Sequence, residues 1–390
     1  MLSVELFAGA GGLAIGMAKA GFHHAAVIEW NPDACETFRE NKRHHTHLVE
    51  EWPLHEGDVR SFDYGTLNGD IMVVSGGPPC QPFSMGGKHR GHLDERDMFP
   101  EAVRAVRELR PRAFIFENVK GLKRDTFATY FEYIRLQLTY PRLQHREGET
   151  WREHCRRLEK HHTARRGAAE YNVVSELLNA ANYGVPQRRE RVFIVGFRAD
   201  LGVAWSFPKP THSHEALLRS KWIAGDYWER HAVPKKQRPA LEGRHAARVE
   251  WLGRGDLFAE GRAPWLTVRD AISDLPDPEK FPDNPIPNHL HNPGARSYKG
   301  HTGSRLDEPA KTLKAGDHGV PGGENTLARA DGSMRYFTVR EAARLQTFPD
   351  DYIFRGAWTE AMRQLGNAVP VILAEVVARS VASSVRANLG

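Results

Sequence analysis

The chain has few cysteines and no long apolar run. Only three of its 390 residues are cysteine, and Cys35, Cys80 and Cys155 lie too far apart for a disulfide framework or a Cys-x-x-Cys metal site. No segment approaches the roughly 20 apolar residues of a membrane span, and the first residues lack the basic and apolar parts of a signal peptide. We therefore expect a soluble, cytoplasmic protein that holds no metal ion and contacts no membrane.

A large excess of one charge is also absent. Lysine and arginine total 54 against 49 acidic residues, and the net charge of +5 permits a polyanionic partner without requiring one. The basic residues gather locally, with nine against four acids in residues 135–166 and twelve against eight in residues 198–262. Either stretch can equally be an ordinary solvated surface, so composition alone leaves nucleic-acid binding open.

The first half of the chain alternates strand-like and helix-like patterns, which predicts an α/β fold with a doubly wound parallel sheet. Asn31 is placed to cap the second helix, with Pro32 in its first turn. The expected strands cover residues 3–7, 25–30, 71–77, 113–119 and 191–197, and the expected helices cover residues 13–20, 31–41 and 98–109.

After residue 198 the composition changes. Prolines, histidines and tryptophans are frequent, apolar periodicity is weak and turn residues interrupt it, which is typical of a loop-rich second domain. Helical patterns return at residues 338–345 and 369–385. The second of these is apolar enough to pack back onto the first domain.

Ligands of a doubly wound sheet bind beyond the carboxyl ends of its strands, so residues at those ends are the candidates for a site. Gly9, Gly11 and Gly12 follow the first strand, and Glu29 ends the second. Glycines let a ligand approach the backbone, and an acid at this spacing can accept both hydroxyls of a ribose. The pattern predicts an adenosine-containing cofactor, either NAD or S-adenosylmethionine. Asp58, at another expected strand end, is either an adenine contact or an ordinary turn aspartate.

Cys80 lies in the sequence GGPPCQPFS, after two prolines and before Gln-Pro. The prolines fix φ and remove backbone donors, so the cysteine is held rigidly, which suits a nucleophile. A zinc deaminase would need a second cysteine at position 83, where this chain has phenylalanine. A lone cysteine is inert more often than reactive, so the loop by itself does not establish the chemistry.

Two more polar groups stand near strand ends. Glu117 lies at the tip of the fourth expected strand, where partial desolvation would raise its pKa and let it donate a proton near neutral pH. Arg189 and Arg191 flank the start of the next strand and share one face of an extended chain, so both can reach a common acidic or carbonyl-bearing site. Taken singly, each of these residues is as readily a structural or surface group.

Together and in this order, the segments resemble the cytosine-C5 DNA methyltransferases. The resemblance rests on ELFAGAGG, IEWNPDA, GDVR, GGPPCQPFS, FENV, PQRRERVFIVG, RYFTVREAARLQTFPDDY and QLGNAVPV. It implies a Rossmann-like, doubly wound methyltransferase domain that uses S-adenosylmethionine, and a smaller, loop-rich target-recognition domain. By the same resemblance, the substrate is a cytosine in double-stranded DNA.

The resemblance implies catalytic roles for five residues. Cys80 would attack C6 of the cytosine while Glu117 protonates N3, which makes C5 electron-rich enough to take the methyl group. Arg191 would contact the cytosine O2 and hold Glu117, with Arg189 in support, and Asn118 would help to position the base. None of these groups reaches a base stacked in a duplex, so the cytosine must be flipped out.

A cofactor pocket follows from the same resemblance. Glu29 would bind the ribose, Trp30 would stack on the adenine, and Asp58 and Val59 would contact it. Taken alone, Trp30 would sooner be a core residue. The other cofactor-binding residues would be Phe7, Gly9, Gly11, Gly12, Pro78, Met98, Asn367 and Val369.

The resemblance also divides the chain. Residues 1–198 and 364–390 would form the catalytic and cofactor-binding domain, and residues 199–363 the target-recognition domain, which reads bases in the major groove. Residues 135–166 are interpreted as an insertion, and residues 84–97 as the active-site loop of the family. We expect a monomer that acts either in a restriction-modification system, with a cognate restriction endonuclease as genetic partner, or as an orphan enzyme.

Three alternatives remain open at this point. A methyltransferase that acts on transfer RNA uses the same scaffold, a DNA-binding relative without turnover would keep the fold, and an NAD-dependent dehydrogenase shares the nucleotide-binding pattern. The large second domain disfavours the first alternative. Intact Cys80, Glu117 and Arg191 disfavour the second, and a dehydrogenase has no use for Cys80 beside Glu117 and the arginine pair.

Overall fold

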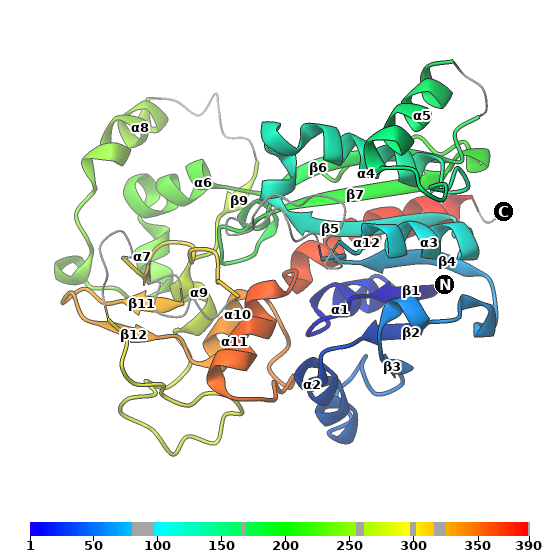
Figure 1. Cartoon of the computed structure of the whole chain (residues 1–390). Helices are drawn as coiled ribbons and strands as arrows, with labels where there is room; N and C mark the ends of the chain where they lie inside the picture. Colours follow the sequence, from blue (N-terminus) through cyan, green and yellow to red (C-terminus); the bar gives the residue numbers. More distant parts are fainter. Residues whose placement is uncertain (80–96, 165–167, 255–260, 297–301, 316–324, 389–390) are drawn as a thin grey trace.

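A seven-stranded sheet lies at the centre of the molecule (Figure 1). The computed structural model describes residues 1–79, 97–164, 168–254, 261–296, 302–315 and 325–388. Along the sheet the strands follow the order β3-β2-β1-β4-β5-β7-β6, so β1 lies between β2 and β4, where the winding reverses. The carboxyl end of β1 is therefore the expected place for a ligand. The strands are β1 (Leu2–Leu6), β2 (His23–Glu29), β3 (Leu54–Glu56), β4 (Ile71–Gly76), β5 (Ala113–Val119), β6 (Tyr171–Asn179) and β7 (Glu190–Arg198).

One strand departs from the parallel sheet expected from the sequence. β7 pairs antiparallel with both β5 and β6, whereas β1 to β5 pair with one another in parallel. The prediction of a wholly parallel sheet was wrong in this respect, because the apolar pattern of a buried strand does not reveal its direction. The reversal brings the amino end of β7 beside the carboxyl end of β5, with Arg191 opposite Val119 and Phe193 opposite Glu117.

Helices cover both faces of the sheet, as a doubly wound fold requires. α1 (Gly12–Lys19) and α12 (Val371–Ala387) lie against one face, and α3 (Phe99–Leu109) and α4 (Ala128–Thr139) lie against the other. The expected packing of the C-terminal helix onto the first domain is confirmed, because the apolar side of α12 is buried with residues of α1, β4, β5 and β7.

The second helix, α2 (Pro32–Arg43), begins as predicted. Asn31 is its N-cap, and the side-chain oxygen of Asn31 accepts a hydrogen bond from the Ala34 amide at 3.0 Å. Pro32 takes the first helical position, where its missing N–H removes no helical hydrogen bond. A local sequence signal therefore decides where this helix starts.

The C-terminal stretch Trp358–Ala387 is long and apolar enough to cross a membrane by composition, contrary to the expectation that no segment approaches this. It consists of α11 (Trp358–Asn367) and α12, separated by residues 368–370, and 61% of its most apolar window is buried inside the protein. Packing against α1 and the central sheet accounts for its apolar composition.

Residues 199–336 form a region of short elements and long connections, as the composition indicates. The boundary proposed at residue 363 stays a prediction. The hydroxyl of Tyr352, which precedes that boundary, donates to the Ala10 carbonyl at 2.8 Å, so the two parts share a core there. The elements after β7 are β8 (His212–Ser213), α6 (His214–Arg219), α7 (Asp226–Arg230), α8 (Gly243–Gly253), β9 (Ala263–Pro264), α9 (Val268–Ile272), β10 (Ser304–Arg305), β11 (Thr326–Ala328), β12 (Met334–Tyr336) and α10 (Val339–Leu345).

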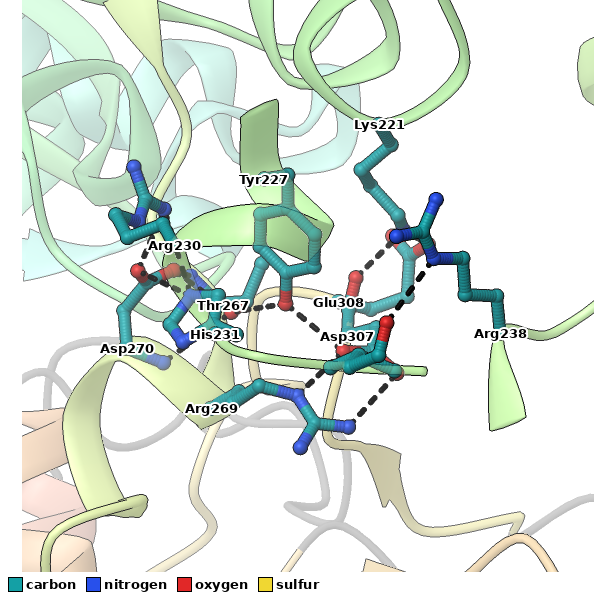
Figure 2. A network of polar contacts seen from close by, with 11 residues as sticks. Lys221, Tyr227, Arg230, His231, Arg238, Thr267, Arg269, Asp270, Asp307 and Glu308 are labelled. Carbon is teal, nitrogen blue, oxygen red and sulfur yellow. Dashed lines mark hydrogen bonds and ion pairs between the residues drawn. The ribbon is translucent and has the colours of Figure 1, made fainter. Parts of the chain in front are cut away.

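Polar side chains hold the middle of this region together (Figure 2). The buried Lys221 ammonium donates to the Asp307 carbonyl at 2.7 Å and to Glu308 Oε1 at 2.9 Å. The Asp307 carboxylate accepts from the Tyr227 hydroxyl at 2.9 Å and from Arg269 Nε at 2.7 Å. These five residues are here called the Asp307 network. They join α7 and α9 to Asp307 and Glu308, which lie about forty or more residues later in the sequence.

The basic stretch interpreted as an insertion contains a second helix that packs on α4. α5 (Trp151–Thr163) begins at a capping box formed by Thr150 and Glu153. Cys155 and Leu158 of α5 are buried in the same cluster as the apolar residues of α4. One side of α5 is thus part of the core, although the interpretation as an insertion stays a prediction.

Candidate active site

The side chains of Glu117, near the end of β5, and Arg191, near the start of β7, meet at one end of the sheet. Arg191 Nε lies 2.7 Å from Glu117 Oε1, and the two side chains are only 10% and 8% exposed. Glu117 lies opposite Phe193, and Arg191, two residues from Phe193, shares its face of the strand. The expected contact between Arg191 and Glu117 is therefore present, and it depends on the antiparallel direction of β7.

Burial governs the protonation of this pair. It raises the pKa of the Glu117 carboxyl, and the nearby Arg191 and Arg189 oppose that shift. Within the described residues, Oε1 has no partner with full hydrogen-bond geometry despite the ion pair with Arg191. Oε2 lies beside Gly77, where an added Cβ would stand 3.3 Å from it. A carboxyl group in this position can hold a proton near neutral pH and donate it to a ligand.

Asn118 ties the end of β5 to the segment that leads to the cysteine. Its Nδ2 donates to the Pro78 carbonyl at 2.9 Å, so in this structure the side chain positions backbone. The expectation that Asn118 positions the base stays a prediction. Cys80 lies outside the described residues, as does the active-site loop expected at residues 84–97, apart from Asp97.

Arg189 has a different role from Arg191. Its guanidinium is fully buried and donates to the carbonyl oxygens of Leu313 at 3.1 Å, Gly366 at 2.5 Å and Ala368 at 2.9 Å. Burial and the nearby Arg191 lower the pKa of Arg189. Both arginines were expected to reach a common acidic or carbonyl-bearing site, but Arg191 contacts Glu117 and Arg189 contacts a separate set of carbonyl oxygens. Arg189 instead fixes the residue before β7 against Leu313 and the C-terminal end of α11.

The turn after β1 and the end of β2 come together, as their spacing predicts. The Gly9 amide donates to Glu29 Oε2 at 2.6 Å, and the amides of Trp30 and Asn31 donate to Oε1 at 3.1 and 2.8 Å. Burial raises the pKa of Glu29, and the three amide hydrogen bonds lower it. Because a carboxylate accepts about four hydrogen bonds, one acceptor position is left for a ligand hydroxyl.

The backbone of this turn is left-handed at three positions. φ is 53° at Phe7, 54° at Gly9 and 85° at Gly11, and for a residue with a side chain this typically costs about 1 to 3 kcal/mol. A Cβ added to Gly9 would meet nothing within 4 Å, whereas one added to Gly12 would stand 2.2 Å from the Val369 carbonyl oxygen. Gly9 thus leaves room for a ligand, and Gly12 permits close packing of α1 against the C-terminal segment.

The remaining candidate cofactor residues differ in exposure. Trp30 is 70% exposed, so the ordinary expectation of a core tryptophan is wrong here and the indole is accessible to a ligand. The Asp58 carboxylate stabilises the local turn that contains it. It accepts hydrogen bonds from the Arg60 amide at 2.9 Å and from Arg60 Nε at 2.8 Å, and these bonds lower the pKa of Asp58. Val59 is buried and Asn367 is exposed.

Two contacts that shape the site were not foreseen. The Met98 amide donates to the Pro79 carbonyl at 3.0 Å, which joins the start of α3 to the residue before Cys80. The Tyr352 hydroxyl fixes the Ala10 carbonyl within the glycine-rich turn. Pro79, Ala10 and Tyr352 lie in segments that resemble the family, but the residue pattern does not predict either contact, because each joins positions that are not neighbours in the chain.

Solved structures support the fold. The chain is similar to the Dnmt2 methyltransferase of S. pombe, with a TM-score of 0.57 and 17% identity over 100% of both chains. It is also similar to a DNA modification methyltransferase encoded within a prophage of E. coli, with a TM-score of 0.57 and 21% identity over 99% of both chains. At these identities the likeness shows the Rossmann-like methyltransferase fold.

Sequence relatives identify the family. The chain is 30% identical to the Type II methyltransferase M.NgoMIV of Neisseria gonorrhoeae, over 98% of both chains. It is 32% identical to the Type II methyltransferase M.PspPI of Psychrobacter sp., over 97% of this chain and 78% of the relative. The family model described as C-5 cytosine-specific DNA methylase matches residues 1–139 and 143–383. The chain therefore belongs to the C-5 cytosine-specific DNA methylase family.

Proposed function

We propose that the protein methylates C5 of cytosine at specific sites in double-stranded DNA, with Cys80 as the nucleophile and S-adenosylmethionine as the methyl donor. The observation that best supports this proposal is the buried ion pair of Glu117 and Arg191. It lies beside Gly77 in the segment that leads to Cys80, and Asn118 holds the Pro78 carbonyl of the same segment. A proton donor and its orienting cation are thereby kept close to the backbone that carries the thiol.

The chemistry assigns a separate task to each group. The Cys80 thiolate forms a bond to C6 of the cytosine while Glu117 gives its proton to N3, and the ring becomes electron-rich at C5. Burial favours the protonated form of Glu117, and Arg191 orients that carboxyl. Once C5 is methylated, loss of the C5 proton breaks the bond from C6 to the Cys80 sulfur and restores the aromatic ring.

The residues around the glycine-rich turn fit S-adenosylmethionine. When bound, this cofactor supplies an electrophilic methyl group on a sulfonium. Glu29 is oriented by three backbone amides and keeps an acceptor position for a ribose hydroxyl, Trp30 offers an exposed ring for adenine, and Gly9 leaves space beside the backbone. The other residues proposed to hold the cofactor are Phe7, Gly11, Gly12, Asp58, Val59, Pro78, Met98, Asn367 and Val369.

The second region, residues 199–363, would read the DNA sequence around the flipped cytosine. The relatives named above are Type II methyltransferases. By analogy, this protein acts as a cytoplasmic monomer in a restriction-modification system and has a cognate restriction endonuclease as genetic partner.

Trapping of the covalent intermediate tests the proposal. Bisulfite sequencing of a plasmid that carries the gene first identifies the methylated site. A duplex with 5-fluorocytosine at that site should then form an adduct with the wild-type protein in the presence of S-adenosylmethionine, because fluorine blocks the loss of a proton from C5. The adduct should survive denaturing electrophoresis and be absent for Cys80→Ser.

Controls separate the remaining alternatives. Cys80→Ser should bind S-adenosylmethionine in calorimetry as the wild type does, since the thiol serves only the reaction. Glu117→Gln should slow adduct formation by about 10² or more, because the amide cannot donate a proton of comparable acidity. Transfer of labelled methyl only to transfer RNA would overturn the DNA substrate, and DNA binding without any transfer would overturn the enzyme.

A further inference from the structure

Helix α4 contacts the chain at the start of α3. Asp97 Oδ2 accepts a hydrogen bond from the Tyr130 hydroxyl of α4, and Oδ1 accepts from the Phe99 amide at 3.3 Å. The next residue, Met98, donates its amide hydrogen to the Pro79 carbonyl at 3.0 Å. A short path of hydrogen bonds and covalent bonds thus runs from Tyr130 to the residue that precedes Cys80.

The aromatic ring of Tyr130 is itself held in place. Tyr130 is only 5% exposed, and its ring meets the Trp151 ring edge to face, with centroids 5.6 Å apart. Trp151 is the first residue of α5, whose start is fixed by the capping box of Thr150 and Glu153. Figure 1 shows α3, α4 and α5 on the same side of the molecule, and α4 contacts both of the others. A tyrosine buried in this way presents its hydroxyl at one position.

We infer that Tyr130 is a positioning residue for the methyl-transfer reaction, and that α5 supports it. Through Asp97 and the Met98 amide, Tyr130 fixes the Pro79 backbone and so the point from which Cys80 is presented. A nucleophile must approach C6 within a few tenths of an ångström of the productive distance, so a looser anchor slows the attack without removing any reacting group. This role also gives the basic stretch at residues 135–166 a task other than contact with DNA phosphates.

The inference rests on the proposed function of Cys80, so the test measures the rate of adduct formation with the 5-fluorocytosine duplex. Tyr130→Phe removes one hydroxyl and keeps the ring. We expect the rate to fall roughly tenfold, as for the loss of one hydrogen bond to a charged group. The dissociation constant for DNA should stay within about twofold of the wild type, because the Tyr130 hydroxyl is buried and hydrogen-bonded to Asp97 and so does not contact DNA.

Tyr133→Phe is the matched control. Tyr133 lies one turn further along α4, is 6% exposed, and its hydroxyl bonds to His154 Nδ1 of α5 at 2.9 Å, so the variant loses an equally buried hydroxyl that does not reach Asp97. Both variants should lower the melting temperature by similar amounts, and Tyr130→Phe should slow the adduct more than Tyr133→Phe, which loosens only the support from α5. Equal adduct rates for the two variants would overturn the inference.

A double-mutant cycle with Asp97→Ala tests the same path of bonds with a second variant, so the inference does not depend on Tyr130→Phe alone. Asp97→Ala should slow adduct formation at least as much as Tyr130→Phe, because it also removes the acceptor of the Phe99 amide, and the double variant should be no slower than Asp97→Ala, because Tyr130 acts through Asp97. Additive losses would show that the two residues act separately and would overturn the inference. Absence of an adduct with the wild-type protein would instead overturn the proposed function.

Discussion

The two regions of this protein place their polar groups by different means. In the sheet, the pairing of β5 with β7 sets Glu117 and Arg191 side by side, and the backbone ladder would keep them there if either side chain were changed. In residues 199–336, the Asp307 network joins α7 and α9 to a distant segment through side chains. A side-chain change in the sheet is therefore expected to leave the arrangement of its strands in place, whereas the arrangement of the second region depends on the Asp307 network.

The largest effect is expected where a buried charge loses its partner. Arg191→Ala leaves the Glu117 carboxylate buried beside an empty position, and such changes typically cost about 3 to 5 kcal/mol. We expect a loss of this order in the free energy of unfolding measured in urea at a pH high enough to ionise Glu117, together with loss of methyl transfer. The loss should shrink as the pH falls, because protonation of Glu117 removes the unpaired charge.

An ion pair on the surface provides the control for this change. Arg379 bonds to Glu375 along α12, and the Arg379 side chain is 61% exposed. Arg379→Ala should therefore cost less than about 1 kcal/mol and leave activity unchanged. If the two arginine variants had similar stabilities even at a pH that ionises Glu117, the pair at the end of β5 and the start of β7 would be solvated, and the argument for a proton donor there would fail.

A methyl group added where two elements touch should have the next largest effect. The Cβ of Gly12→Ala would stand 2.2 Å from the Val369 carbonyl oxygen, and because that oxygen belongs to the backbone and cannot rotate away, helix α1 must shift. We expect a loss of about 2 to 3 kcal/mol in the free energy of unfolding and weaker binding of S-adenosylmethionine in calorimetry. In the second region, Gly253 of α8 has nothing within 4 Å of its added Cβ, so Gly253→Ala should change stability by at most about 1 kcal/mol, and in the stabilising direction.

The elements of the sheet region could be predicted closely from the sequence. Residues 113–119 form β5 as expected, residues 98–109 differ from α3 by one residue, and the cap at Asn31 is present. Strong local signals explain this success, since apolar periodicity and capping residues act within a few positions. β3 (Leu54–Glu56) was expected only as a strand that ends near Asp58, and β6 was missed because it alternates irregularly between buried and exposed positions.

Part of the candidate site could also be predicted. The spacing of Gly9 and Glu29 correctly indicated that they meet, and the contact of Arg191 with Glu117 followed from a resemblance. The carbonyl oxygens bound by Arg189 and the bond between Tyr130 and Asp97 could not be predicted, because each joins residues remote in sequence whose meeting depends on the finished fold.

The pH dependence of stability provides another test of the sheet region, through the buried His24 of β2. Burial lowers the pKa of His24 to about 4, and the ring contacts Ser3 Oγ at 3.1 Å and the Ala14 carbonyl at 3.0 Å. The folded protein thus favours neutral His24, so this stabilisation is complete above the unfolded pKa of about 6.5 and declines as the pH falls toward 4. At about pH 5 the loss should reach roughly 2 kcal/mol.

The measurement compares urea unfolding of the wild type and of His24→Gln at about pH 7.5 and at about pH 5. The glutamine does not titrate, so the difference between the two proteins should change by roughly 2 kcal/mol between these conditions. His47→Gln, at an exposed position, should follow the wild type. Parallel pH profiles for the wild type and His24→Gln would mean that water reaches the ring in the folded protein.

Apart from the controls, the smallest expected loss of stability is also the most selective test of the comparison. Lys221→Met keeps an unbranched chain among the rings of Trp222, Tyr227 and Trp228 but loses the bonds to Asp307 and Glu308. Because the Glu308 side chain is 26% exposed, water can replace part of the loss, and we expect a cost of about 1 to 2 kcal/mol.

Binding measurements on Lys221→Met decide whether the two regions are organised separately. The affinity for duplex DNA, measured by fluorescence anisotropy, should fall because the segment Ser220–Ala224, just before α7, loses its bonds to Asp307 and Glu308, while calorimetry should find the affinity for S-adenosylmethionine unchanged. Glu308→Gln removes only the charged partner and leaves the bond from Lys221 to the Asp307 carbonyl, so it should weaken DNA binding less. If Lys221→Met lowered the affinities for DNA and for S-adenosylmethionine equally, the Asp307 network would also support the sheet. The contrast between a region held by backbone pairing and a region held by side-chain bonds would then be wrong.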